Sequence, residues 1–565
     1  MRSSRPALTV SHVRGVTDDP LGTETVCGLL AAAARRHPDL EAAVFAARAV
    51  RWTWRELLRQ VETAAAGFAR LGVRAGDRVG LWSPNRPEWL VAQFAVAQLG
   101  AILVPLNPAY REKELGYVLN QAGVSTLVTV GAFGRNNCVG MLGNLGFGVD
   151  AGGGRLPWLR AVVCLGDDDV PGMSSWPTLM ASGRRSAAWL PPEPEPAPAP
   201  KPAPDDRAPA LILFTGGTTG VPRGATLSHH AVVNNARAVA RGLRLQAGDR
   251  VCVPVPLYHC FGLVLSVLGC AAQGATLVFP GPVFDAAATL ATVARERCTV
   301  LHGVPAMFVA LRDQARRAPG ELGTLRTGLM AGASCPRTLV RRVQRALHLP
   351  DLAIAYGMTE TGPVSFMTSL DDPPARRADN VGHVLPHLEA QVVDAEGRVL
   401  PVGQPGELRT RGYAVMQSYW RDPERTAEAL RDGWMHTGDL ATLDAEGRCR
   451  IVGRVSELVR RGDVNVLPGD VEALLLRHPK VAAVQVFGVP DAVLGEELCA
   501  WVIAKPGRAC AIAEIRRFCR DRLAPAQVPR YIRFVDRLPV TVSGKPRKFV
   551  MRDLMMRELS LDVED

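Results

Sequence analysis

The chain has 565 residues, of which 47% are hydrophobic and 21% are charged, and its mean hydropathy is +0.06. This balance excludes a globally disordered chain, a collagen-like repeat and a coiled-coil rod. The length requires one large domain and at least one smaller one. The formal net charge is +11, but the basic residues are scattered along the sequence, which favours ordinary surface chemistry over a nucleic-acid partner.

The cysteines bear on the cellular compartment. There are 12 of them with no C-x-x-C pair, and several lie in apolar segments, for example Cys252 and Cys270. This usage predicts reduced thiols in the cytoplasm, with the mitochondrial matrix as the alternative, because Arg and Ser precede the first acid, Asp18. The longest stretch without a charged residue, 251–284, is interrupted by Pro and Gly. We therefore expect a strand, a helix and a second strand there, and no membrane span.

Hydrophobic periodicity predicts alternating helices and strands along the first half of the chain. Thr53 to Glu56 forms a capping box at the start of a helix that ends near Gly72. Strands are expected at 79–82, 101–105, 126–128 and 210–214, and helices through Trp89 and Phe94 and over 113–122. This alternation favours βαβ units, so the predicted fold class is α/β, with a large N-terminal domain of layered sheets and helices.

Three further segments indicate the domain organisation. Residues 131–154 contain nine glycines and little periodicity, which is typical of a surface excursion. Residues 191–206 form a Pro/Ala linker that should be extended. From about residue 455 a new pattern predicts helices at 470–477 and 511–522 and strands at 481–489, 499–504 and 531–535. We therefore expect domains at 1–455 and 456–565, the second being a small α+β domain.

A glycine- and threonine-rich loop follows the predicted strand at 210–214. Its sequence is TGGTTGVPRG, and its backbone N–H groups and hydroxyls can converge on phosphate oxygens, with Arg223 as a cation at the rim. The Walker A pattern cannot be aligned to it. The loop predicts a nucleotide phosphate site made of Thr215, Gly216, Gly217, Thr218, Thr219, Gly220 and Arg223.

Five further motifs follow along the chain in this order: PLYHCFG at 256–262, YGMTE at 356–360, TGD at 437–439, GR at 453–454 and SGK at 543–545. Together with the loop they resemble the adenylate-forming superfamily, which contains acyl-CoA synthetases, peptide-synthetase adenylation domains and firefly luciferases. Stretches such as LNPAYREKELGYVL and VPRYIRFVDRLPVTVSGKPRKF are most similar to acyl-CoA synthetase family member 2 and its bacterial fatty-acyl-CoA ligase relatives.

The resemblance implies a role for each motif. Tyr356 stacks on adenine, Gly357 permits close backbone approach and Thr359 offers a hydroxyl. Mg²⁺ is ligated by Glu360 and Thr218, since it prefers hard oxygen ligands. The implied catalytic residues are Lys545, Glu360, His259 and Thr218. The implied nucleotide contacts add Gly332, Ala333, Asp439 on the ribose hydroxyls, Arg454 on ribose or phosphate, and Lys545.

The implied activity is that of an ATP-dependent acyl-CoA ligase, which uses ATP, Mg²⁺ and CoA to activate a medium- or long-chain fatty acid through an acyl-adenylate. The resemblance also implies an AMP-binding domain at 1–455 and a mobile C-terminal domain that rotates about Ser456 between the two half-reactions, with a homodimer as a possible assembly. Phe261, Val304 and residues 331–335 are candidate acyl-pocket walls. The sequence leaves the acyl chain itself open.

Four positions depart from the family pattern. Gly216 replaces the commoner Ser, Arg223 stands where Lys is usual, Ser456 where Asp or Lys is usual, and Asp463 where Gly is usual. Three alternatives stay open, the second of them because of the departures at Arg223, Ser456 and Asp463. They are a ligase that passes the acyl group to a carrier protein, an enzyme of specialised metabolism acting on an aryl acid or another nucleophile, and a non-catalytic nucleotide-binding relative.

Overall fold

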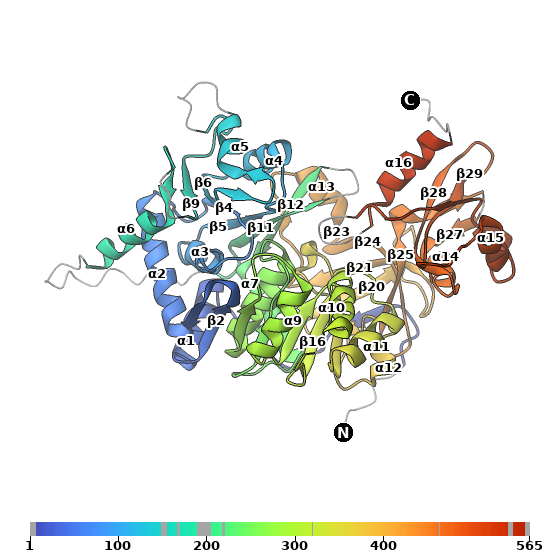
Figure 1. The fold of residues 1–565 in the computed structure, drawn as a ribbon, viewed down its shortest axis with the longest axis horizontal. Helices are drawn as coiled ribbons and strands as arrows, with labels where there is room; N and C mark the ends of the chain where they lie inside the picture. Colours follow the sequence, from blue (N-terminus) through green and yellow to red (C-terminus); the bar gives the residue numbers. More distant parts are fainter. Residues whose placement is uncertain are drawn as a thin grey trace. The chain divides into compact units, whose positions relative to one another are not determined.

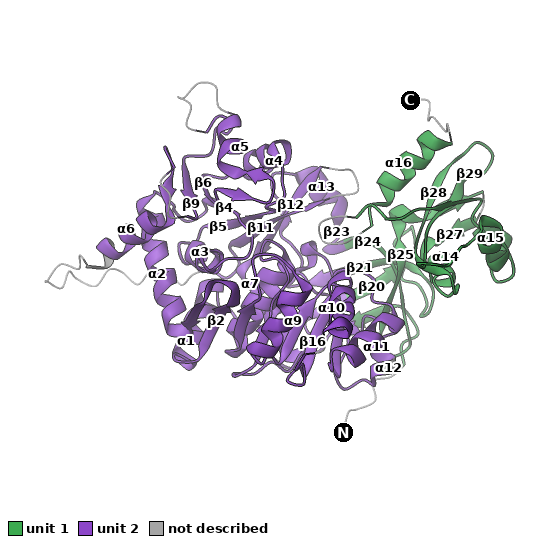
Figure 2. Cartoon of the chain, in the orientation of Figure 1, with its two compact units in different colours: residues 1–13, 390–409, 436–565 green, residues 14–389, 410–435 purple. Residues whose placement is uncertain are grey.

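The computed structural model describes residues 7–147, 155–166, 170–188, 205–216, 221–318, 320–462, 464–540 and 546–559. The chain divides into two compact units, 14–389 with 410–435 and 1–13 with 390–409 and 436–565 (Figure 2). One large and one small unit of mixed α/β structure confirm the predicted fold class. The domain boundary at 455 stays a prediction, since the contacts group residues 436–455 with the C-terminal segment.

An eight-stranded sheet in the larger unit carries the phosphate-loop candidate (Figure 1). Its order is β10-β9-β6-β4-β5-β11-β12-β22, parallel from β10 to β11 and antiparallel at β12 and β22. The strands are β4 (Arg78–Trp82), β5 (Ile102–Leu106), β6 (Thr126–Thr129), β9 (Ala161–Cys164), β10 (Ser174–Ser175), β11 (Pro209–Gly216), β12 (Pro222–Ser228) and β22 (Ser418–Tyr419). The predicted βαβ alternation is thereby confirmed.

A nine-stranded sheet of the same unit has the order β19-β18-β17-β16-β15-β13-β14-β2-β3. The strands are β2 (Glu41–Phe45), β3 (Val50–Thr53), β13 (Arg250–Cys252), β14 (Thr276–Phe279), β15 (Val300–Gly303), β16 (Thr327–Ala331), β17 (Asp351–Tyr356), β18 (Phe366–Met367) and β19 (His383–Val384). Its six strands from β17 to β2 are parallel neighbours. Their carboxyl ends therefore lie at one edge.

Helices form the layers on these sheets. One hydrophobic core joins both sheets through α1 (Val26–Arg36), α2 (Trp54–Arg70), α3 (Pro87–Gln98), α4 (Glu112–Ala122), α7 (His229–Gly242) and α8 (Gly269–Gln273). A second core lies under α9 (Ala286–Arg295), α10 (Pro305–Arg317) and α11 (Arg337–Ala346). The capping box predicted at α2 is confirmed, because the Thr53 N–H donates to Glu56 and the Glu56 N–H donates to the Thr53 hydroxyl.

One prediction for this unit needs correction, and another is confirmed with an added detail. Residues 131–154 contain more than a surface excursion: a hairpin of β7 (Ala132–Phe133) and β8 (Asn136–Asn137) leads into helix α5 (Cys138–Asn144), which buries Cys138, Met141 and Leu142. Residues 148–154 lie outside the described part. The sequence did not predict this helix, because its apolar residues span only two turns and lie among glycines. The helix expected within 251–284 is present, but residues Phe261–Leu268 form a π-helix.

The smaller unit contains its own sheet, β27-β26-β29-β28, with β30 beside β29. These strands are β26 (Val459–Arg461), β27 (Val464–Val466), β28 (Val481–Asp491), β29 (Gly495–Ala504) and β30 (Tyr531–Phe534), with α14 (Pro468–Leu475) and α15 (Ile512–Arg520) on one core and α16 (Lys548–Glu558) on another. Strands β20 (Leu388–Val393), β21 (Gly406–Gly412), β24 (Trp434–Leu443) and β25 (Cys449–Arg454) lie side by side in that order.

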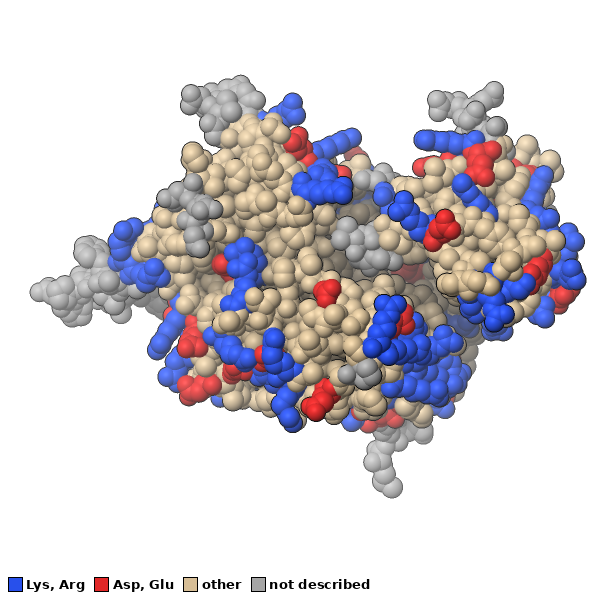
Figure 3. Space-filling view, viewed as in Figure 1, with Lys and Arg blue, Asp and Glu red and all other residues tan. Residues whose placement is uncertain are grey.

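The fold concentrates basic charge that looks scattered in the sequence. Exposed Arg316 and Arg317 end α10, and α11, which packs against α10, exposes Arg337, Arg341, Arg342 and Arg345. Figure 3 shows basic side chains gathered over these helices. Among the described residues, no helix is long and apolar enough to cross a bilayer.

Candidate active site

The phosphate-loop candidate begins where strand β11 ends. Strands β11 and β12 pair so that Thr215 faces Arg223 and Gly216 faces Pro222. Residues Gly217, Thr218, Thr219 and Gly220 lie outside the described residues, and their roles stay predictions. The pairing corrects the expected place of Arg223, which belongs to a strand and not to the loop. The hairpin holds this cation beside Thr215, since cross-strand partners share one face of a sheet.

Glu360 supplies a buried carboxylate at the base of this loop. It lies in a single 3₁₀ turn, Thr359–Thr361, after strand β17, and its exposed fraction is 5%. Its Oε1 accepts hydrogen bonds from the Thr215 hydroxyl at 3.2 Å and from the Tyr419 hydroxyl at 2.9 Å. The donor set of a carboxylate and hydroxyls suits Mg²⁺, which takes hard oxygen ligands. The residues present therefore fit the predicted metal.

Tyr419 is a site residue that the sequence analysis missed. It pairs with Ala225 across β22 and β12, two residues beyond Arg223, so its ring lies on the face that carries Arg223. The Arg223 guanidinium carbon lies 5.4 Å from the Tyr419 ring centroid. Burial and then the Glu360 carboxylate raise the pKa of Tyr419, which keeps its phenol protonated as a hydrogen-bond donor. No local pattern around residue 419 indicates this, because only the strand pairing brings it to Glu360.

Arg223 also carries an unsatisfied donor. Its Nε is buried and has no hydrogen-bond partner among the described residues. Buried donors of this kind are rare in folded proteins and call for a partner. A phosphate oxygen would provide a charge-assisted partner, which agrees with the role predicted for this cation.

Three predicted positions lie at one edge of the nine-stranded sheet. Val304, Gly332 and Gly357 directly follow β15, β16 and β17, which are parallel neighbours. This carboxyl edge is where open α/β sheets bind ligands. Gly332 has φ +90°, and a Cβ placed on it would lie 3.4 Å from Cγ1 of Val304. Ala333, the next residue, is exposed.

Position 357 requires glycine because a neighbouring turn of the protein lies against it. A Cβ at this position would lie 2.0 Å from the carbonyl oxygen of Pro363, closer than any side chain tolerates. The close backbone approach predicted at Gly357 is made by the turn at Pro363, and a contact of Gly357 with the nucleotide stays a prediction. Tyr356 is half-buried, and its ring centroid lies 6.4 Å from that of Phe366. Adenine stacking on Tyr356 remains a prediction.

The PLYHCFG and YGMTE motifs meet in space, although about a hundred residues separate them in sequence. The Sγ of Cys260 lies 3.7 Å from Oγ1 of Thr359. Next to it, His259 accepts a hydrogen bond from the Phe261 N–H through Nδ1 at 3.2 Å. A neutral ring that accepts at Nδ1 carries its proton on Nε2, which assigns the tautomer of His259. The structure therefore brings Cys260, the neighbour of His259, to Thr359, and the catalytic role implied for His259 stays a prediction.

The predicted ribose contacts form a pair within the smaller unit. Asp439 faces Arg454 across β24 and β25, and the Arg454 Nε donates to the Asp439 carboxylate at 2.8 Å. The Thr437 hydroxyl donates to the Leu408 carbonyl at 2.6 Å, and the Asp439 N–H donates to that hydroxyl. These contacts fix the buried Asp439 in place. A direct contact of Arg454 with ribose or phosphate remains a prediction.

Lys545 and Asp463 lie outside the described residues, and the catalytic role of Lys545 stays a prediction. The helix that follows Lys545 is firmly attached. Lys548, its first residue, forms ion pairs of 2.8 Å with Glu457 and 2.9 Å with Glu472. Ser456, the predicted hinge, precedes Glu457 in a single 3₁₀ turn, Val455–Glu457. The ion pairs therefore tie the segment after Lys545 to the segment after Ser456.

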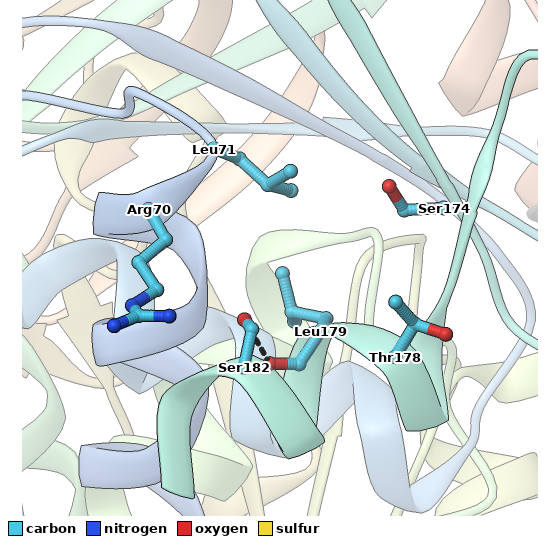
Figure 4. Close-up of a pocket in the computed structure, with 6 residues that line it drawn as sticks. All are labelled: Arg70, Leu71, Ser174, Thr178, Leu179 and Ser182. Carbon is cyan, nitrogen blue, oxygen red and sulfur yellow. Dashed lines mark hydrogen bonds between the residues drawn. The ribbon is translucent and has the colours of Figure 1, made fainter. Parts of the chain in front are cut away.

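A cavity elsewhere in the larger unit is unrelated to these residues. It measures about 420 Å³ and lies between the end of α2 and helix α6 (Trp176–Ala188), as Figure 4 shows. Its lining residues are Arg70, Leu71, Ser174, Thr178, Leu179 and Ser182. None of the predicted site residues lines it. It supports no functional argument.

Known proteins match the chain along most of its length. The sequence profile described as AMP-binding enzyme matches residues 30–420, and that of the AMP-binding enzyme C-terminal domain matches residues 470–545. The mitochondrial medium-chain acyl-CoA ligase ACSF2 of Danio rerio is 39% identical, over 99% of this chain and 93% of that protein. The Homo sapiens protein of the same name is 38% identical, over 99% and 92%. YngI of Bacillus subtilis is 37% identical, over 95% and 98%.

Solved structures share the fold over nearly the whole chain. ATP-bound MatB from Rhodopseudomonas palustris superimposes with a TM-score of 0.81 at 27% identity, over 95% of this chain and all of that one. The anthranilate CoA ligase AuaEII, in complex with anthranoyl-AMP, also gives a TM-score of 0.81, over 96% and 99%, at 24% identity. At that identity the likeness concerns the fold alone.

Proposed function

Because the chain belongs to the AMP-binding enzyme family, we propose that it activates a medium-chain fatty acid with ATP and transfers the acyl group to CoA. It is an AMP-forming acyl-CoA ligase, an acid–thiol ligase that works through an acyl-adenylate. The single observation that carries the proposal is the buried Glu360 carboxylate, held by Thr215 and Tyr419 where the phosphate loop begins.

The reaction has two balanced steps. A carboxylate oxygen of the acid attacks the α-phosphorus of ATP, which forms the acyl-adenylate and releases pyrophosphate. The CoA thiol then attacks the acyl carbon, loses its proton, and releases AMP with the acyl-CoA. Both steps depend on positioning and charge neutralisation, since anionic groups must approach one another.

The chain's own residues would supply that neutralisation. Glu360 and Thr218 would hold Mg²⁺, which supplies positive charge to the phosphate oxygens when bound. Arg223 would donate to the pyrophosphate leaving group, and its buried Nε, which has no hydrogen-bond partner within the described part of the chain, supports that assignment. Asp439, held by Arg454, would accept from the ribose hydroxyls. Lys545 would donate to the acyl carboxylate and the α-phosphate.

The preference for a medium chain rests on the relatives. The two vertebrate proteins named above are medium-chain acyl-CoA ligases, and each is 38–39% identical over 99% of this chain. Val304 follows β15 at the edge where Gly332 and Gly357 follow their strands, and the ring centroid of Phe261 lies 5.8 Å from that of His302 in β15. Both placements support the assignment of Phe261 and Val304 to the acyl pocket. The apolar stretch of the π-helix would supply the remaining walls.

A substrate screen tests the proposal. ATP–pyrophosphate exchange is measured with fatty acids from acetic to stearic acid and with a set of aryl acids, and products are then identified with CoA or with a holo carrier protein. We expect the highest kcat/KM for medium-chain fatty acids and acyl-CoA as the product. Preferred exchange with an aryl acid, or acyl transfer only to the carrier protein, would favour the alternative ligases. Tight ATP binding with no AMP formed would leave a nucleotide-binding protein.

Location and assembly remain predictions. The vertebrate relatives are named as mitochondrial proteins, and one relative comes from Bacillus subtilis. These names agree with either the cytoplasm or the mitochondrial matrix for this chain. A homodimer is likewise a prediction, and sedimentation of the purified chain tests it.

A further inference from the structure

A buried histidine beside the candidate acyl pocket has a nitrogen with no partner in the described segments of the chain. His302 lies in strand β15 and is 0% exposed. Its Nδ1 lies 2.9 Å from the Ser266 hydroxyl, whereas its Nε2 has no hydrogen-bond partner among the described residues. A buried polar atom left unpaired is destabilising, so such atoms are rare and usually find a ligand or a water.

The contacts of Ser266 assign the tautomer of His302. The Ser266 hydroxyl donates to the carbonyl of Phe261 at 3.2 Å within the π-helix. A hydroxyl has one hydrogen, so Ser266 can only accept from His302, and the proton of the neutral ring lies on Nδ1. Burial lowers the pKa of His302 to about 3, which keeps the ring neutral. Its Nε2 is therefore an acceptor that requires an O–H or N–H donor.

The position of His302 relates it to the predicted acyl walls. Its ring centroid lies 5.8 Å from that of Phe261. Val304 lies two residues further along the same strand direction, on the same face, and approaches Gly332 at the carboxyl edge. Two strand residues span roughly 6.6 Å, so His302 lies that much deeper than Val304. An acid with its carboxylate at the sheet edge would bring the middle of its chain to this depth.

We propose that His302 forms a polar subsite in the acyl pocket, whose Nε2 accepts a hydrogen bond from a hydroxyl group in the middle of the substrate's chain. The preferred substrate class is therefore a hydroxylated medium-chain fatty acid. This inference rests on the proposed acyl-CoA ligase function and specifies its substrate. Ser266 is the positioning residue, since it holds the ring through Nδ1 and leaves Nε2 as the nitrogen without a partner among the described residues.

Three substitutions of His302 test the subsite. His302→Gln places a polar atom near the position of Nε2, His302→Asn keeps one only near Nδ1, and His302→Leu keeps neither. ATP–pyrophosphate exchange is measured with octanoic acid, with octanoic acid carrying a mid-chain hydroxyl and with the corresponding ketone. The quantity compared is kcat/KM for the hydroxy acid divided by kcat/KM for octanoic acid, so that a general loss of activity cancels. Thermal unfolding confirms that each variant folds.

We expect the parent to favour the hydroxy acid about tenfold, the scale of one hydrogen bond to an otherwise unpaired buried atom. His302→Leu and His302→Asn should lose this preference, and His302→Gln should retain most of it. If His302→Gln loses the preference for the hydroxy acid and His302→Asn retains it, the ring acts structurally through Ser266. This result would overturn the subsite. A preference for the ketone, or equal ratios in all variants, would also overturn it. No exchange with any acid would instead refute the ligase function and this inference with it.

Discussion

Replacing Glu360 by Gln should abolish most adenylate formation and leave the protein folded. The change removes the negative charge of a carboxylate that is 5% exposed but keeps an oxygen that can accept from Thr215 and Tyr419. Each of these hydrogen bonds then falls from a charged to a neutral type, a loss on the order of 1 kcal/mol apiece. A domain of this size should tolerate a total loss of about 2 kcal/mol.

The effect on the rate should be larger than the effect on stability. Glu360 would act through the Mg²⁺ that it holds, whose positive charge offsets the negative charge that develops on the phosphate oxygens. The loss of one charged group at such a site costs about 3–4 kcal/mol, so Glu360→Gln should lose about 10²–10³ in kcat. Tyr419→Phe is the matched control, because it removes one donor to Glu360 but keeps the carboxylate. It should lose only about tenfold, the value of one hydrogen bond to a charged group.

The assay is ATP–pyrophosphate exchange over a range of Mg²⁺ concentrations, with thermal unfolding measured in parallel. Glu360→Gln should need more Mg²⁺ and should stay slow when Mg²⁺ is saturating. Near-normal exchange at saturating Mg²⁺ would remove Glu360 from the site. A loss in Tyr419→Phe as large as in Glu360→Gln would show that the hydroxyl network, and not the charge, matters.

Three further predictions concern other residues of the chain. Arg223→Ala should raise the KM for ATP more than that for the acid, whereas Arg223→Lys should retain activity; unchanged ATP kinetics in the Ala variant would make Arg223 a structural cation over Tyr419. Lys545→Ala should lose at least about 10²-fold in adenylate formation and still convert pre-made acyl-adenylate and CoA at close to the parent rate, and equal losses in both half-reactions would refute the domain-rotation hypothesis. Burial lowers the pKa of His229 to about 4 and that of His302 to about 3, so the unfolded chain binds more protons below about pH 6.5 and stability should fall as the pH drops. The slope should approach about 1.4 kcal/mol per pH unit for each histidine, and urea unfolding of His302→Leu should show a smaller slope than the parent; identical slopes would contradict the buried neutral ring.

Much of the fold and of the candidate site follows from the sequence, because local patterns determine it. Periodicity and the capping box predicted α2 and the βαβ alternation, and the ordered motifs predicted the family that the comparisons confirm. Glycine-rich and charged motifs can be recognised in the sequence because their chemistry needs particular residue types at fixed spacing. The glycines at 131–154 misled the prediction of helix α5, since two turns of helix give too short a periodic signal.

Tertiary structure alone decided which of these residues meet. Tyr419 reaches Glu360 only because β22 pairs with β12, and no pattern near residue 419 encodes that pairing. The nitrogen of His302 that has no partner among the residues that the structure describes is likewise not predictable from the sequence, because it depends on how β15 packs against the π-helix through Ser266. Hydrogen bonds act over about 3 Å, whereas the sequence orders residues only along the chain. The sequence therefore determines which residue types are available for the chemistry. The packing of distant strands determines which of these residues become hydrogen-bond partners.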